Sequence, residues 1–144
     1  MNIRRMTADD SRAVSALCRE LGYDCSAAQV QARFERLPSD HLTLVAEQNG
    51  EVVGWLHAGW HPTLTSDVRI EILGLVISEA HRQQGIGRGL VEEVERWTQQ
   101  VGCRRVRVRS NEERQNAARF YERLGYRTTK TQKVFDKETP APLS

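Results

Sequence analysis

Residues 70–97 constrain the fold of this chain more than any other stretch, because they combine an apolar run, a glycine-containing turn and an amphipathic pattern. Residues 70–77 are mostly apolar, and the order of the three pieces predicts a strand, a loop and a helix. The loop ends in Gln84-Gly85-Ile86-Gly87, and the apolar residues that follow at helical spacing are Leu90, Val91, Val94 and Trp97. Such a loop turns backbone N–H groups toward one point, in front of the positive end of a helix dipole. The stretch therefore predicts a site for a phosphate or pyrophosphate.

Two well-known phosphate-binding motifs fit this loop poorly. Counted from Gly85, the third glycine of a Rossmann fingerprint would fall at Leu90, and no βαβ unit with a following acidic residue is apparent. A Walker A loop requires Gly-Lys-Ser/Thr, which the chain lacks here. A glycine-rich turn between a strand and a helix, with no ligand at all, is the remaining structural alternative.

Length and composition indicate one globular domain. The 144 residues are 39% apolar and 28% charged, and no apolar run is long enough for a membrane span. Three scattered cysteines, Cys18, Cys25 and Cys103, fit free thiols in a reducing compartment, and the histidines add no metal-binding spacing. A net charge of +2 gives no reason to expect nucleic acid. We therefore expect a cytoplasmic protein with a single domain at residues 1–136, a disordered tail at 137–144, and no metal, membrane or nucleic-acid partner.

The remaining elements follow from periodicity and turn residues. Capping-box patterns at Thr7 and Ser26 predict two helices before the sheet, and Asn49-Gly50 predicts a β-hairpin. Gly102 and Gly125 are expected to end two later helices. The predicted strands are residues 2–6, 41–47, 51–60, 70–77, 103–109, 126–130 and 131–136, and the predicted helices are residues 7–21, 26–37, 86–101 and 111–124.

This element order and two motifs resemble the GNAT superfamily of N-acetyltransferases. Arg82-x-x-Gly85-x-Gly87 is similar to its Arg/Gln-x-x-Gly-x-Gly/Ala signature. A second motif, Ala117-x-x-Phe120-Tyr121-x-x-x-Gly125-Tyr126, resembles the Ala-x-x-Phe-Tyr-x-x-x-Gly-Phe/Tyr segment of the family. The resemblance implies an α/β (mixed α+β) fold, with a twisted, mostly antiparallel sheet of six to seven strands and helices on both faces.

The resemblance also implies acetyl-coenzyme A as the acetyl donor. In the family, the strand at residues 75–77 splays from its neighbour to bind the pantetheine arm, and the loop backbone wraps the pyrophosphate. Many members place an Asn three residues before the Ala of the second motif, where this chain has Arg114, with Asn111 three residues earlier. The residues expected to bind the cofactor are Leu75, Val76, Ile77, Arg82, Gln83, Gln84, Gly85, Ile86, Gly87, Arg88, Asn111 and Tyr121.

Two residues are candidates for proton transfer. By the Phe-Tyr motif, Tyr121 is the expected general acid for the coenzyme A sulfur; the alternative is an ordinary core aromatic. Glu71 is the expected general base, since its distance from the glycine motif equals that of the catalytic glutamate in histone-acetylating members. Its alternative is a strand carboxylate on a solvated face, and Asp67 and His61 are weaker substitutes.

The acceptor is less constrained than the donor. The resemblance favours direct transfer to a primary amine of a small molecule, such as an aminoalkylphosphonate or an aminoglycoside. A protein lysine or N-terminal amine is an alternative acceptor, and a non-catalytic acyl-coenzyme A sensor is an alternative function. Arg105, Arg107 and Arg109 share one strand face, which fits a solvated surface better than a nucleic-acid site. Homodimers are common in the family, so a homodimer of this chain is an open alternative to a monomer.

Overall fold

The structure is a computed structural model that describes residues 1–110 and 115–142. Its contacts divide the chain into two compact units, Met1–Arg109 and Ser110–Ser144. The first unit contains one sheet with helices α1 (Ser11–Glu20), α2 (Ala27–Glu35) and α3 (Ile86–Gln100), and the second contains helix α4 (Gln115–Arg123). The expected single domain at residues 1–136 stays a prediction.

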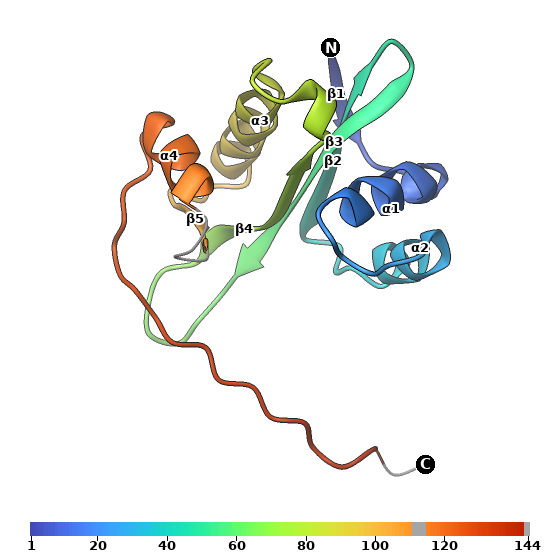
Figure 1. Cartoon of the computed structure of the whole chain (residues 1–144). Helices are drawn as coiled ribbons and strands as arrows, with labels where there is room; N and C mark the ends of the chain where they lie inside the picture. The colour runs from blue at the N-terminus through green and yellow to red at the C-terminus, as the bar shows by residue number, and fades with distance from the viewer. Residues whose placement is uncertain (111–114, 143–144) are drawn as a thin grey trace. The chain divides into compact units, whose positions relative to one another are not determined.

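The sheet is mixed and mostly antiparallel, as predicted (Figure 1). Its strand order follows the chain, and only the last pair, β4 with β5, is parallel. The turn between β2 and β3 has Asn49 and Gly50 at φ of 53° and 78°, which confirms the predicted hairpin. The strands are β1 (Asn2–Arg5), β2 (His41–Gln48), β3 (Glu51–His61), β4 (Arg69–Ile77) and β5 (Val106–Val108).

The predicted number of strands is wrong. The described sheet has five strands rather than six to seven, because residues 126–136 form no strand in the described structure. The β-branched and aromatic residues of this segment favour an extended backbone, but a strand also needs a partner and a face to bury. Val134 and Phe135 are instead 82% and 86% exposed.

Helices cover both faces of the sheet, with α1 and α2 on one side and α3 on the other (Figure 1). Because strand side chains alternate between faces, Leu44 and Leu56 pair on the α3 face, whereas Val45 and Trp55 pair on the α1 face. Fully buried apolar side chains fill the space between this face and α3. Leu56 and Ile70 come from the sheet, and Leu90, Val91 and Val94 come from the helix.

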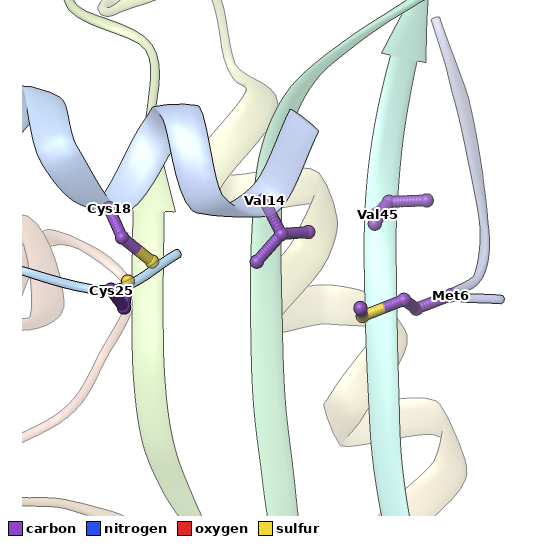
Figure 2. Packing of buried hydrophobic residues seen from close by; sticks show 5 residues of the cluster. All are labelled: Met6, Val14, Cys18, Cys25 and Val45. Carbon is purple, nitrogen blue, oxygen red and sulfur yellow. The ribbon is translucent and has the colours of Figure 1, made fainter. Parts of the chain in front are cut away.

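On the α1 face, a smaller cluster fixes the two N-terminal helices (Figure 2). Val14 and Cys18 of α1 pack with Met6, Cys25 and Val45, and the Cys18 and Cys25 side chains lie beside each other in Figure 2. Burial, and then the neighbouring Cys25, raise the pKa of Cys18 to about 11, so the thiol stays protonated.

Both predicted capping boxes are present: the Thr7 box opens the 3-10 turn Ala8–Asp10 that precedes α1, and the Ser26 box opens α2. The Thr7 N–H donates to Asp10 Oδ2 at 2.8 Å, and Gln29 N–H donates to Ser26 Oγ at 3.1 Å. Each bond satisfies a backbone donor that the helix itself leaves unpaired.

Candidate active site

An extra residue in β4 changes the course of the strand beside the glycine loop. His57 pairs with Gly74 and Ala58 with Ile72, so Leu73 is a bulge residue. In the described residues, β5 pairs only with positions 70–72 of β4. Among residues 1–110 and 115–142, the backbone from Gly74 to Ile77 therefore has a strand neighbour on the β3 side alone. Leu75, Val76 and Ile77 lie in this open part of β4, where the resemblance predicts pantetheine binding.

The glycine loop connects this open strand end to α3. Gly85 is the N-cap of the helix at φ 82°, and the first helical bond runs from Gly89 N–H to the Gly85 carbonyl at 3.0 Å. Gln83 also has a positive φ, 63°. A Cβ built on Gly85 would meet no atom within 4 Å. Glycine is therefore favoured here by the left-handed backbone and not by close packing. The first turn of α3 contains no acidic residue, which leaves the positive end of the dipole uncompensated there.

Two arginines flank this helix N-terminus. The Arg82 Nε donates to the Ile77 carbonyl at 3.4 Å, which ties the loop back to the end of β4. Arg88 is exposed and pairs with Glu92 one turn later, Nε to Oε1, at 2.7 Å. The structure thus brings the predicted strand residues and loop residues 82–88 to one end of the sheet. Their role in binding a cofactor stays a prediction.

Glu71 is not on a solvated face. Its side chain is 7% exposed, and its Oε1 accepts a hydrogen bond from Arg109 Nε at 3.1 Å. Its Oε2 lies 3.8 Å from His61 Nδ1. Asp67, a weaker candidate for the same role, is exposed in the loop before β4. The arrangement gives a buried carboxylate with one oxygen fixed by a guanidinium and the other near an imidazole.

Two further groups near Glu71 were not predicted from the sequence. Arg69 is buried on the same strand face as Glu71, and its Nη1 donates to Ser66 Oγ at 3.3 Å. His41 and His57 form a pair on neighbouring strands, with Nδ1 of His41 2.8 Å from Nε2 of His57. Period-2 alternation along 69–71 could have placed Arg69 beside Glu71, but no sequence pattern identifies the histidine pair.

Tyr121 lies on α4 in the second unit. Its ring meets those of Phe120 and Tyr126 edge to face, with centroids 5.0 and 5.7 Å away. Burial raises the pKa of Tyr121 to about 12, so the hydroxyl keeps its proton at neutral pH. Helix α4 ends at Arg123, and the predicted stop residue Gly125 follows two residues later with a φ of 94°. Asn111 lies outside the described residues.

The described residues contain no group of three His, Cys, Asp or Glu side chains that could hold a metal ion. All three cysteines are buried and free, and the Cys103 thiol donates to the Val68 carbonyl. Within the described ranges, no helix has the length and apolar character needed to cross a membrane.

Comparisons with known proteins identify the family and agree with the fold. The model of the acetyltransferase (GNAT) family matches residues 10–126. The aminoalkylphosphonate N-acetyltransferase of Salmonella typhimurium is 33% identical over 132 residues, which cover 87% of this chain and 84% of the relative. A transcriptional regulator from Bacillus halodurans C-125 has a similar structure, with a TM-score of 0.82, 26% identity, and coverage of 94% of this chain and 99% of the other. An aminoglycoside N-acetyltransferase in complex with coenzyme A superposes with a TM-score of 0.85 at 20% identity, covering 96% and 95% of the two chains.

Proposed function

The chain belongs to the acetyltransferase (GNAT) family, and from this premise we propose that it transfers an acetyl group from acetyl-coenzyme A directly to a primary amine of a small molecule. The observation that carries the proposal is the open end of β4, which leads into a helix N-terminus capped by Gly85. The relative from Salmonella typhimurium acts on aminoalkylphosphonates, which supports a small acceptor.

The residues present fit acetyl-coenzyme A. The free edge of β4 at Leu75, Val76 and Ile77 offers backbone groups of the kind that an amide-containing arm can pair with. The N–H groups of Ile86, Gly87 and Arg88 have no acceptor within their own helix, and they are suited to a pyrophosphate. Arg82, Gln83 and Gln84 complete the loop, and the guanidinium of Arg82 or Arg88 adds positive charge.

When bound, acetyl-coenzyme A supplies an activated acetyl group as a thioester. A backbone N–H near Val76 is the candidate for polarising the carbonyl, a contact that typically contributes about 3 kcal/mol. Glu71 is the candidate that accepts the proton of the acceptor's ammonium group, so that the nitrogen becomes nucleophilic. Tyr121 is the candidate that donates a proton to the departing sulfur, and its raised pKa keeps that proton available at neutral pH.

The test separates binding from turnover. We expect acetyl-coenzyme A at 100 times its Kd to stabilise the native protein by about 2.7 kcal/mol, a Tm increase on the order of 10 °C. We also expect thiol release with a panel of small primary amines. Stabilisation without release on small amines, lysine peptides or peptide N-termini would instead support a non-catalytic acyl-coenzyme A sensor. Release with the peptides alone would support a protein acetyltransferase, and the absence of stabilisation would contradict the proposal at its first step.

A further inference from the structure

The α1 face of the sheet changes from apolar to charged along the strands. Near the β2–β3 hairpin, Val45, Trp55 and Val76 lie side by side across three strands. Further along the same face, the register aligns Gly59 with Glu71, and Glu71 with Arg107 of β5. The next pair on this face is His61 with Arg69. We call this region the charged half, and its residues are His41, His57, His61, Arg69, Glu71, Arg107 and Arg109.

Positive charge exceeds negative charge in the charged half. Glu71 is the one carboxylate that the register of the described strands places there, and it already accepts a hydrogen bond from Arg109. Loss of hydration, and then the positive charges of Arg69 and Arg109, lower the pKa of Arg107, whereas Glu71 acts in the opposite direction. Three guanidinium groups thus lie close enough to repel one another around a single carboxylate.

One donor of the buried Arg69 side chain is left unpaired, although its Nη1 donates to Ser66 Oγ. The residue is 6% exposed, and its Nε has no hydrogen-bond partner among the described residues. A buried donor on a charged group that is left unpaired is costly, and native structures rarely keep one without a ligand, ion or water to satisfy it. An anion held between Arg69 and Arg107 would supply both the missing acceptor and the missing negative charge.

The charged half is also reachable. The side chains of Arg109 and His61 are 50% and 42% exposed, although the Glu71 carboxylate between them is buried. A small molecule can therefore approach Glu71 from solvent while passing along guanidinium groups. Glu71 and Arg107 are opposite each other on neighbouring strands, roughly 5 Å apart in the backbone. A molecule that places its amine at Glu71 and its acid group at Arg107 therefore needs only a short carbon chain between the two groups.

We propose that Arg69, Arg107 and Arg109 form a subsite for an anionic group of the acetyl acceptor, so that the substrate is a small amine carrying a phosphonate, phosphate or carboxylate. This inference rests on the proposed function, because it assigns the acceptor of that same reaction. Guanidinium groups bind such oxyanions through paired hydrogen bonds. A polycationic amine such as an aminoglycoside meets like charge here, and the charged half selects against it.

The first experiment compares acceptors on the wild-type protein. The panel contains an aminoalkylphosphonate, the amino carboxylate of equal chain length, the corresponding neutral amino alcohol, and an aminoglycoside. We expect kcat/KM to be at least about 10-fold higher for the two acidic amines than for the amino alcohol, and lowest for the aminoglycoside. Equal or better use of the neutral or polycationic amine overturns the proposal.

The second experiment removes a guanidinium. We expect Arg107→Gln to lower kcat/KM for the acidic amines about 10- to 100-fold, mainly through KM, and to leave the amino alcohol within about 2-fold of wild type. Arg96→Gln, on the exposed surface of α3, removes the same charge elsewhere and should change neither. A preference for acidic amines that survives in Arg107→Gln contradicts the subsite.

A binding measurement separates this inference from the proposed function. Alkylphosphonate without an amine cannot be acetylated, so calorimetry with it reports the subsite alone. We expect the wild type to bind alkylphosphonate, and Arg107→Gln to bind it at least about 10-fold more weakly. Both proteins should bind acetyl-coenzyme A with the same affinity. Alkylphosphonate binding without turnover on any amine contradicts the proposed function and supports the anion subsite. Turnover without alkylphosphonate binding supports the proposed function and contradicts the anion subsite. Both outcomes are measured on the wild-type protein, so they hold even if Arg107→Gln fails to fold.

Discussion

At the scale of single residues, the buried ion pair of Glu71 supports its proposed role as the general base. Arg109 holds one oxygen of the carboxylate, and the second oxygen, 3.8 Å from His61 Nδ1, is the proposed acceptor of the substrate proton. We expect Glu71→Gln to lower kcat by about 100-fold or more, with little change in acetyl-coenzyme A affinity. Tyr121→Phe should lower kcat without altering that affinity more than a few-fold, because it removes the proton and keeps the ring. Steady-state kinetics and calorimetry provide both measurements.

The matched control for Glu71 is Glu93→Gln, which breaks an exposed pair with Arg96 on α3. A surface pair of this kind contributes little stability, so neither kcat nor Tm should move. A Glu71→Gln protein with a lower Tm and an unchanged kcat would show that the carboxylate is structural.

The sequence alone predicted Glu71 as a candidate but not its surroundings. Its spacing from the glycine motif can be counted along the chain, whereas the bond to Arg109 joins residues 38 positions apart. That bond depends on the parallel pairing of β4 with β5, and no local pattern specifies this pairing. The His41–His57 pair was missed for the same reason, because the two rings meet only through the register of β2 and β3. Arg69 could have been placed beside Glu71 by the alternation of residues 69–71.

At the scale of elements, the loop before α3 has a matched counterpart in the β2–β3 hairpin. Gly85 and Gly50 have φ values of 82° and 78°, and a Cβ on either meets nothing within 4 Å. We expect Gly85→Ala and Gly50→Ala to cost similar stability, about 1 kcal/mol each, because both force a side chain into a left-handed backbone. Only Gly85→Ala should also weaken acetyl-coenzyme A binding, by roughly 10-fold or more, because this loop is the proposed site of the pyrophosphate.

Thermal unfolding with and without acetyl-coenzyme A measures both effects in one experiment. Equal cofactor affinity in the two variants argues that the glycine loop does not contact the donor.

Local chemistry explains why these elements were predictable: capping boxes, Asn-Gly turns and glycine stops each act within a few residues. The two C-terminal strands were predicted wrongly because their formation depends on a partner that the residue pattern does not specify.

At the scale of the whole molecule, the sequence predicted the family and the layered arrangement better than the extent of the sheet. The acetyltransferase (GNAT) family model covers residues 10–126, and helices lie on both faces of the sheet as expected. The apolar α3 face follows from alternation in Leu42, Leu44, Ile70 and Ile72. The α1 face carries charge over half its length, and alternation cannot distinguish a solvated face from a binding surface.

The half-buried histidine pair, His41 and His57, makes the stability of the whole molecule depend on pH. Burial, and then the neighbouring His41, lower the pKa of His57 from 6.5 to about 4. The unfolded chain therefore binds a proton between pH 6.5 and 4 that the folded protein excludes, and the free energy of unfolding falls as the pH drops through this window. We expect the loss that is due to His57 to be on the order of 2 kcal/mol, less than the full shift implies because the ring is partly exposed. In His57→Asn, urea unfolding should show this loss removed between pH 6.5 and 4, while the offset from wild type stays constant from pH 7 to 8.5. If the free energies of unfolding of the wild type and His57→Asn fell in parallel between pH 6.5 and 4, His57 would not be the cause of the loss.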